Sequence, residues 1–225
     1  MPELYQVYQK LLNLHGPQGW WPIGGKYSGK TNLTESDKVE ICVGAILAQN
    51  TTWKNVERTL STLQQDNMLS LQAISKVSGK TLSEMILSSG YHNQKSRKLQ
   101  LFAKHVLAKH GTCSKFLNQP SEILRPELLS LWGIGPETAD SIILYAAQKP
   151  VFVIDTYTRR IVENLELVPP ETPYDLLQQQ FEQQLPKNTH LFKEFHALIV
   201  KHAKVCCKKN HVVGKNCILS KTFIS

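Results

Sequence analysis

The sequence predicts an all-α protein with short connections between its helices. Apolar residues recur at helical spacing along most of the chain, and glycine or proline stands where many of these runs end. Only residues 150–154 could form a strand. The chain has no evident internal repeat, low-complexity tract or coiled-coil heptad. We therefore expect a fold built from helices alone.

The N-terminal part of the chain predicts a helix, a loop and a buried helix. Apolar positions between residues 3 and 14 follow a helical period, which the Gly-Pro-Gln-Gly-Trp-Trp-Pro run at 16–22 interrupts. A glycine-rich loop follows. Residues 39–48 are almost wholly apolar, as expected of a helix buried on all sides, and Thr51 or Thr52 can cap the next helix.

Glycine and proline residues mark the ends of further predicted helices. The middle of the chain predicts helices over three ranges: 70–77, 82–89 and 94–109. Gly90 and Gly111 end the last two, and Pro126 is expected at the first position of another helix. Beyond residue 155 the pattern predicts three more helices: 156–165, 173–185 and 189–206.

The segment Leu131-Trp-Gly-Ile-Gly-Pro-Glu-Thr-Ala-Asp140 carries the clearest functional signal. Gly133 and Gly135 precede Pro136, whose fixed φ and missing N–H suit the first position of a helix. The backbone N–H groups at such a helix start point outward and can bind a phosphate without side chains. A simple tight turn between two helices is the alternative explanation.

The composition favours a nucleic-acid partner. The chain has 225 residues, enough for one domain or two small ones, and a net charge of +8. It begins Met-Pro-Glu-Leu-Tyr, without a basic start and apolar region, and no stretch approaches the roughly 20 apolar residues that span a bilayer. We expect a cytoplasmic, nucleoid-associated protein with no membrane partner.

Taken together, these motifs resemble the endonuclease III (helix-hairpin-helix) superfamily of base-excision DNA glycosylases over nearly the whole chain. Leu131-x-Gly-Ile-Gly-x-x-Thr-Ala is similar to that family's hairpin, and Val-Ile-Asp155-Thr resembles the segment that presents its catalytic aspartate. Ala48-Gln49-Asn50-Thr51 resembles the turn whose glutamine enters the DNA stack. The segment 90–98 resembles a further family segment. The resemblance implies that DNA is contacted by Gln49, Gly133, Ile134, Gly135, Thr138, Lys95, Arg97 and Lys98.

The resemblance also implies the architecture and the partner. We expect a two-lobed fold with the active cleft between the lobes: a contiguous lobe over 30–148 that carries the hairpin, and a second lobe made of 1–29 and 149–225 that carries the catalytic aspartate. The expected partner is double-stranded DNA containing alkylated bases, and we expect a monomer without a cofactor. The basic residues of segment 90–98 have a solvent-facing surface as their alternative role.

Asp155 is the predicted catalytic residue. Base excision flips a nucleotide out of the duplex and breaks its C–N bond through an oxocarbenium-like sugar. The Asp155 carboxylate would stabilise that cation and position or deprotonate the attacking water. Its alternative role is a helix N-cap, because a helical pattern follows it.

Glu137 is the first departure from the family pattern. Bifunctional members carry a lysine two residues after the second glycine of the hairpin, and that lysine forms a Schiff base with the sugar. Glu137 stands at this position, and a carboxylate cannot form an imine. The resemblance therefore implies the monofunctional branch, without lyase activity. An anion in the first turn of a helix also favours the helix dipole, which is the structural alternative for Glu137.

The C-terminal cysteines are the second departure. Many relatives hold an iron–sulfur cluster on four cysteines spaced C-x6-C-x2-C-x5-C. Counted from Cys207, that spacing reaches Gly214, Cys217 and Phe223, so two ligands are missing. We expect no cluster and no metal. A mixed zinc site is the alternative, with ligands drawn from Cys206, Cys207, Cys217, His202 and His211.

Trp20 and Trp21 indicate the substrate. The run 16–22 resembles the N-terminal motif of the 3-methyladenine DNA glycosylases in this superfamily. Indole rings stack on purines, and a purine alkylated at N3 or N7 is cationic, so attraction to the π face adds to stacking. We expect both side chains in a base pocket. The alternative for one or both is a hydrophobic plug of the N-terminal segment against the second lobe.

Two other functions remain open from the sequence. A mismatch glycosylase acting on uracil or thymine would need polar groups that recognise the pyrimidine edges, and only Gln49 and Asn50 stand out as candidates. A non-catalytic DNA-binding module would keep the hairpin and the basic surface but would not need Asp155.

Overall fold

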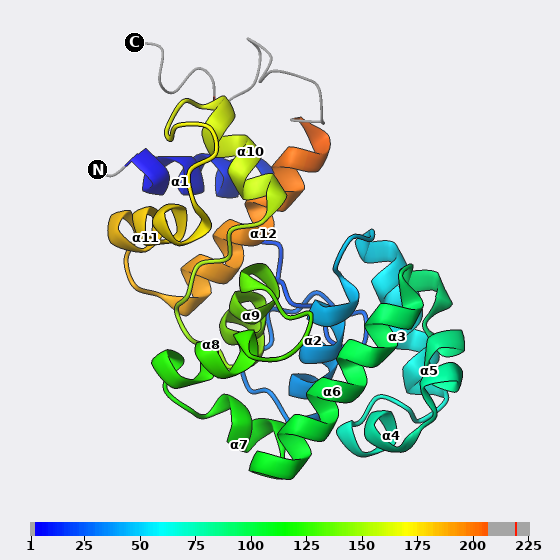
Figure 1. Ribbon diagram of the computed structural model, residues 1–225. Helices are drawn as coiled ribbons and strands as arrows, with labels where there is room; N and C mark the ends of the chain where they lie inside the picture. Colours follow the sequence, from blue (N-terminus) through cyan, green and yellow to red (C-terminus); the bar gives the residue numbers. More distant parts are fainter. Residues whose placement is uncertain (1–2, 207–218, 220–225) are drawn as a thin grey trace. The chain divides into compact units, whose positions relative to one another are not determined.

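The computed structural model describes residues 3–206 and 219 of the chain (Figure 1). It divides into two compact units. The contiguous unit comprises residues 21–149, and the composite unit combines residues 1–20 with the chain from residue 150 onward. No β-strand occurs among residues 3–206, so the predicted all-α class is confirmed. None of the helices in the described part of the chain is long and apolar enough to cross a membrane.

The contiguous unit is built around the helix α2 (Glu35–Leu47). Thr34 starts α2 through a capping box: its Oγ1 accepts the N–H of Asp37, whose carboxylate accepts the N–H of Thr34. All residues from Val39 to Leu47 are buried, as their apolar run predicts. The helices around α2 are α3 (Trp53–Gln65), α4 (Leu71–Lys76), α5 (Gly79–Met85), η1 (Leu87–Ser89), α6 (His92–His110), α7 (Cys113–Leu117), α8 (Ser121–Leu129), α9 (Pro136–Ser141) and the π-helical turn η2 (Ile142–Ala146).

The composite unit packs its helices on α12 (Thr189–Val205). The other helices are α1 (Glu3–His15), α10 (Thr156–Asn164) and α11 (Tyr174–Gln184). Helices α1 and α10 both lie against α12, and α11 lies against α1. Four phenylalanine rings meet in the core, with centroid separations from 4.3 to 6.0 Å: Phe152, Phe181, Phe192 and Phe195. Aromatic burial therefore joins segments that are distant in sequence.

The boundary between the units differs from the expected one. The sequence suggested a division near residue 30, whereas residues 21–29 group with the contiguous unit. Trp21 explains the difference, because it is buried against Trp53 and Tyr145 in that unit. The Gly24 N–H also donates to Glu40 Oε1 at 2.8 Å. The loop after Trp21 is thus held by α2.

Pro126 does not start a helix, contrary to the sequence prediction. Helix α8 begins at Ser121, after Pro120 at the N-cap, and Pro126 lies inside it. A proline in this place removes one donor of the i→i−4 pattern. Helix α8 ends only three residues later, at Leu129. Proline at the first helical position is only a statistical preference, and here Ser121 has that position.

Candidate active site and DNA interface

The hairpin turn between α8 and α9 is shaped by its glycines. Gly133 has φ of +80°, a conformation that strains any residue with a side chain, and a Cβ there would lie 2.4 Å from Lys98 Cε. Gly135 is the N-cap of α9 in an extended conformation, no side chain caps this helix, and Pro136 follows. Both glycines are exposed. No side chain therefore caps the first backbone N–H groups of α9, as the sequence suggested.

A buried ion pair fixes the angle of the hairpin. Arg125 on α8 donates from Nε and Nη2 to the two carboxylate oxygens of Asp140 on α9, at 2.7 and 3.1 Å. Asp140 is completely buried. Ile134 in the turn is buried as well, so its side chain anchors the turn instead of meeting a ligand. Bidentate pairing restrains both position and orientation, and the two hairpin helices therefore have one preferred arrangement.

Gln49 is bound to the hairpin in this structure. Its Nε2 donates to the Gly133 carbonyl at 3.0 Å and to Thr138 Oγ1 at 2.9 Å, and its Oε1 accepts a hydrogen bond from Lys98 Nζ. Thr138, expected to contact DNA, is buried, with its hydroxyl facing Gln49. The structure thus brings together Gln49, Lys98, Gly133 and Thr138. Entry of Gln49 into a DNA stack requires these hydrogen bonds to be exchanged.

The basic residues of α6 that were expected to contact DNA have different environments. Lys95 is only 1% exposed, and its ammonium donates to the carbonyls of Leu47 at 2.8 Å and Ser89 at 2.6 Å. Burial lowers its pKa to about 8. Its expected phosphate contact is therefore wrong, because the side chain binds one carbonyl at the end of α2 and one at the end of η1 instead. Arg97 is exposed, and its guanidinium lies 4.4 Å from the centre of the Trp132 ring.

Asp155 combines two roles at the start of α10. It is the N-cap, and its Oδ1 accepts the Thr158 N–H at 2.7 Å. Its Oδ2 lies 3.4 Å from His196 Nε2 on α12. Burial tends to raise the pKa of Asp155, but hydrogen bonding and charge from His196, together with the Thr158 N–H, outweigh it and lower the pKa. The carboxylate is therefore held ionised, and one oxygen is occupied by the cap.

The segment before Asp155 is supported by side chains of α11. Residues 150–154 could have formed a strand, but they are irregular and belong to no ladder. The Phe152 N–H donates to Glu182 Oε1 at 2.8 Å, its carbonyl accepts from Gln178 Nε2 at 2.6 Å, and the Ile154 N–H donates to Tyr174 Oη at 3.3 Å. Tyr174, Gln178 and Glu182 stand four residues apart, on one face of α11. The side chains on this face thus supply hydrogen bonds that a neighbouring strand would otherwise make with the backbone of residues 150–154.

His196 and the α11 face were not identified from the sequence. Lys204 is a further neighbour: it lies 5.5 Å from the Tyr157 ring, and the Asp155 charge partly offsets the lowering of its pKa by burial. The one available signal was the spacing of Tyr174, Gln178 and Glu182 on an amphipathic helix, which is common and unspecific. Only the fold pairs these residues with the Asp155 segment.

The two tryptophans have different environments. Trp21 is buried, with ring centroids 5.0 Å from Trp53 and 5.2 Å from Tyr145. A Cβ at Gly44 would lie 2.9 Å from Trp21 Cζ2, so this glycine makes room for the indole. Trp21 is thus a packing residue, but it fills the core of the contiguous unit, whereas the plug alternative placed it against the second lobe. Trp20 is half-buried and is the last residue of the N-terminal part of the composite unit.

The alternative zinc site lies mostly outside the described residues. Cys207, Cys217 and His211 belong to the part of the chain that is not described. Cys206 is exposed at the end of α12. His202 is buried, and its Nδ1 lies 3.0 Å from His15 Nε2. Burial, followed by interaction with His15, lowers the pKa of His202 to about 4, and burial also lowers the pKa of His15, so both imidazoles are neutral at physiological pH.

A family model for HhH-GPD superfamily base excision DNA repair proteins matches residues 43–187, which include Gln49, the hairpin and Asp155. The chain belongs to this superfamily. It is 38% identical over 224 residues to a protein of Methanocaldococcus jannaschii that is a DNA repair glycosylase by name, a match that covers 99% of this chain and 96% of that protein. Endonuclease III of Thermotoga maritima is 24% identical over 188 residues, with 84% of this chain and 83% of that protein covered.

Solved structures show the same fold. The 3-methyladenine DNA glycosylase of H. pylori bound to 1,N6-ethenoadenine is similar with a TM-score of 0.75 and 26% identity, over 91% of this chain and 98% of that one. A non-covalent endonuclease III–DNA complex is similar with a TM-score of 0.75 and 16% identity, over 96% and 92% of the two chains. The chain is thus a DNA N-glycosylase of base excision repair, and its expected superfamily and helix-hairpin-helix fold are confirmed.

Proposed function

We propose that this glycosylase is monofunctional and excises alkylated purines, chiefly 3-methyladenine, with water as the nucleophile. The observation that carries the proposal is Glu137. It is exposed in the first turn of α9, at the position where the family resemblance expects the lysine of strand-cleaving members. A carboxylate cannot form a Schiff base, so the sugar is attacked by water and an abasic site is left.

Asp155 is the proposed catalytic residue. Its ionised carboxylate stabilises the positive charge that develops on the sugar as the C–N bond breaks. The oxygen that accepts the Thr158 N–H fixes the carboxylate, and His196 lies at the other oxygen. The same carboxylate positions or deprotonates the attacking water.

Trp20 is the proposed stacking residue for the flipped base. An N3-alkylated adenine is cationic, so it gains from the π face of an indole, and it leaves as a neutral base without protonation. A site without an evident general acid therefore suffices for this substrate. The similarity to the H. pylori 3-methyladenine glycosylase, at 26% identity, supports the same substrate class.

The hairpin is the proposed DNA clamp. Backbone donors near Gly133 and Gly135 bind a phosphate, and the exposed Arg97 and the partly exposed Lys98 add charge beside them. Gln49 is the proposed residue that takes the place of the flipped base, after exchange of its hydrogen bonds to the hairpin. The protein acts as a monomer on double-stranded DNA.

Parallel release assays test the substrate. The protein is incubated with methylated DNA and with oligonucleotides that carry G·T or G·U mismatches, and the released bases are separated and quantified. Release of 3-methyladenine with intact mismatches is expected. Release of thymine or uracil in preference to 3-methyladenine would identify a mismatch enzyme, and release from no substrate would indicate a non-catalytic DNA-binding protein.

Borohydride trapping tests the mechanism separately. An imine between protein and DNA is reduced to a stable covalent complex, which migrates slowly in a denaturing gel. No complex is expected here, with an endonuclease III as the positive control. A trapped complex that forms during base release would refute the monofunctional assignment.

A further inference from the structure

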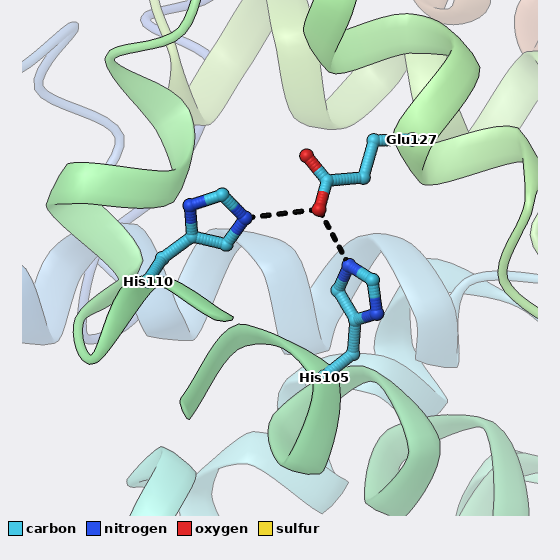
Figure 2. Close-up of side chains that lie close together, drawn as sticks. All are labelled: His105, His110 and Glu127. Carbon is cyan, nitrogen blue, oxygen red and sulfur yellow. Dashed lines mark hydrogen bonds and ion pairs between the residues drawn. The ribbon is translucent and has the colours of Figure 1, made fainter. Parts of the chain in front are cut away.

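A second cluster of functional side chains lies between α6 and the first helix of the hairpin (Figure 2). His105 and His110 belong to α6, and Glu127 belongs to α8. Glu127 Oε1 lies 2.7 Å from His105 Nε2 and 2.9 Å from His110 Nε2. All three residues are half-buried, and one ligand atom from each lies within 4.8 Å of the others. Two imidazoles and one carboxylate therefore converge on one point.

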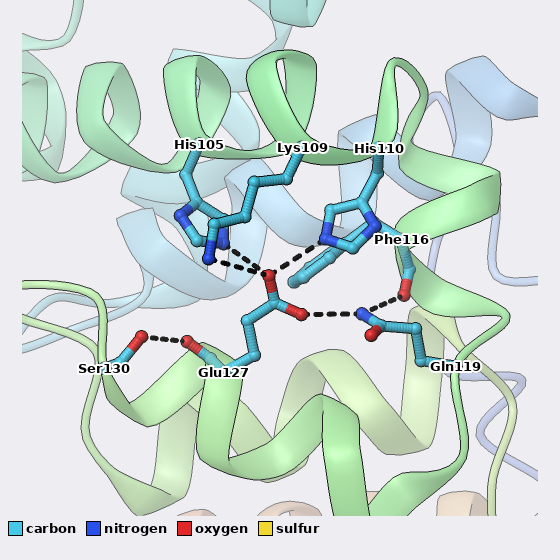
Figure 3. Close-up of polar contacts among 7 residues, drawn as sticks. All are labelled: His105, Lys109, His110, Phe116, Gln119, Glu127 and Ser130. Carbon is cyan, nitrogen blue, oxygen red and sulfur yellow. Dashed lines mark hydrogen bonds and ion pairs between the residues drawn. The ribbon is translucent and has the colours of Figure 1, made fainter.

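The carboxylate of Glu127 is oriented by its hydrogen bonds, because one oxygen faces the two imidazoles and the other faces Gln119. Gln119 Nε2 donates to Glu127 Oε2 at 2.8 Å and also to the Phe116 carbonyl at 3.1 Å (Figure 3). Because Gln119 holds Oε2, the other oxygen faces the two imidazoles. Such an outer contact is what orients a metal-binding carboxylate.

The surroundings of the cluster allow a cation to enter. Lys109 Nζ lies 3.9 Å from Glu127 Oε1, but the Lys109 side chain is 63% exposed and can swing into solvent (Figure 3). The Phe116 ring lies on the inner side, with its centroid 5.1 Å from that of His110. The site therefore has an apolar wall on one side and a movable ammonium on the other.

We propose that His105, His110 and Glu127 bind a Zn²⁺ ion that joins the end of α6 to the hairpin helix α8. Two imidazole nitrogens and one carboxylate oxygen are typical zinc ligands, whereas Mg²⁺ and Ca²⁺ prefer oxygen alone. Each imidazole moves its proton to Nδ1 and presents the Nε2 lone pair to the metal. Water completes the tetrahedron.

The fit requires Glu127 Oε1 to move slightly away from the two imidazoles. Zinc bonds of about 2.0–2.1 Å in a tetrahedron place neighbouring ligand atoms roughly 3.3 Å apart. Glu127 Oε1 is now 2.7 and 2.9 Å from the imidazole nitrogens, so it retreats by roughly 0.5 Å when the metal replaces the shared hydrogen bonds. A carboxylate at the end of a glutamate side chain reaches this position by small torsional changes.

Zinc titration of the metal-free protein, without a histidine tag, tests the site. One equivalent of Zn²⁺ per chain should bind, and zinc at about 100 times its Kd should raise the Tm by about 5–10 °C. Mg²⁺ at the same concentration should leave the Tm unchanged. A chain whose Tm does not respond to zinc overturns the proposal.

Variants assign the bound zinc to this cluster. The substitution His110→Gln should abolish the zinc-dependent rise in Tm, whereas the exposed His190→Gln should retain it. A variant with Cys206→Ser, Cys207→Ser and Cys217→Ser should also retain it, which separates this site from a site at the cysteines. A full response in His110→Gln, or its loss in the cysteine variant, overturns the proposal.

Imidazole resonances test the same site in the unaltered protein, where folding of a variant is not in question. Zinc should shift the Nε2 signals of His105 and His110, and that of His190 should stay in place. Shifts confined to other histidines overturn the proposal.

Discussion

The hairpin turn and the segment before Asp155 each lead into a helix start, but they are held in place differently. The turn is shaped by its own residues, with Gly133 at φ of +80° and Pro136 at the first helical position. The segment 150–155 is held by side chains from α11, about 20 to 30 residues further along the chain. One structure is encoded locally, and the other depends on tertiary contacts.

This difference suits the two proposed tasks, phosphate binding and catalysis. A phosphate clamp needs bare backbone donors, so its helix start carries no side-chain cap. A catalytic carboxylate needs a fixed position and an ionised state, and Asp155 obtains both from the Thr158 N–H and from His196. The cap is therefore absent where DNA is expected and present where charge is needed.

Removing the charge of Asp155 should have the largest effect. The substitution Asp155→Asn should lower base release by roughly 10²–10⁴-fold, because the amide neither stabilises the sugar cation nor activates water. Asparagine is as good an N-cap as aspartate, so the Tm should hardly change. Single-turnover release and thermal unfolding measure the two effects. Unchanged release would remove Asp155 from the mechanism.

A side chain at Gly133 should damage the locally encoded turn. The substitution Gly133→Ala should destabilise the protein by about 1–3 kcal/mol, because it combines a positive φ with a clash against Lys98. Gly135→Ala is the matched control, since φ is −95° there and a Cβ has nothing within 4 Å. Its stability should change by less, about 0.5–1 kcal/mol, because alanine is a poorer N-cap than glycine. Equal destabilisation of both variants in denaturant unfolding would contradict the prediction.

Removing one α11 donor should damage the tertiary-encoded segment. Gln178→Leu leaves the Phe152 carbonyl without the Gln178 donor and should cost about 1–2 kcal/mol of stability. Base release should fall as well, because this segment leads directly to Asp155. The exposed neighbour Gln179 supplies the control Gln179→Leu. If Gln178→Leu lost stability but kept full release at a temperature where it is folded, the segment would not position Asp155.

Lowering the pH should weaken the helix start at Asp155 and not the one at Gly135, and this effect should be the smallest of the four. The pKa of Asp155 is lowered in the folded state, so its contribution to stability is present above the unfolded value of 3.8 and is lost as the pH falls through the folded value. The cap bond is worth about 1 kcal/mol. The unfolding free energies of the unaltered protein and of Asp155→Asn, measured between pH 6 and pH 2.5, should therefore be similar at pH 6 and diverge at low pH, where the unaltered protein becomes the less stable by about 1 kcal/mol. Parallel profiles would show that Asp155 does not titrate in this way.

Sequence patterns predicted the elements whose causes are local. The helix over 3–14, the buried run from Val39 to Leu47 and the turn at Gly133 depend on neighbouring residues and on helical periodicity. The same patterns failed where contacts are distant. Lys95 looked like a surface cation, yet its ammonium binds two carbonyls in the interior. Trp21 looked like a stacking residue, yet Gly44 leaves it space in the core.

The sequence by itself determined the helix-hairpin-helix motif, the carboxylate at Glu137 and the aspartate that caps α10, because backbone conformation and reactive groups belong to adjacent residues. The tertiary structure alone decided that His196 meets Asp155, that one face of α11 supports the preceding segment, and that His105, His110 and Glu127 converge. These groups are brought together by burial of apolar helix faces, which sequence spacing does not specify.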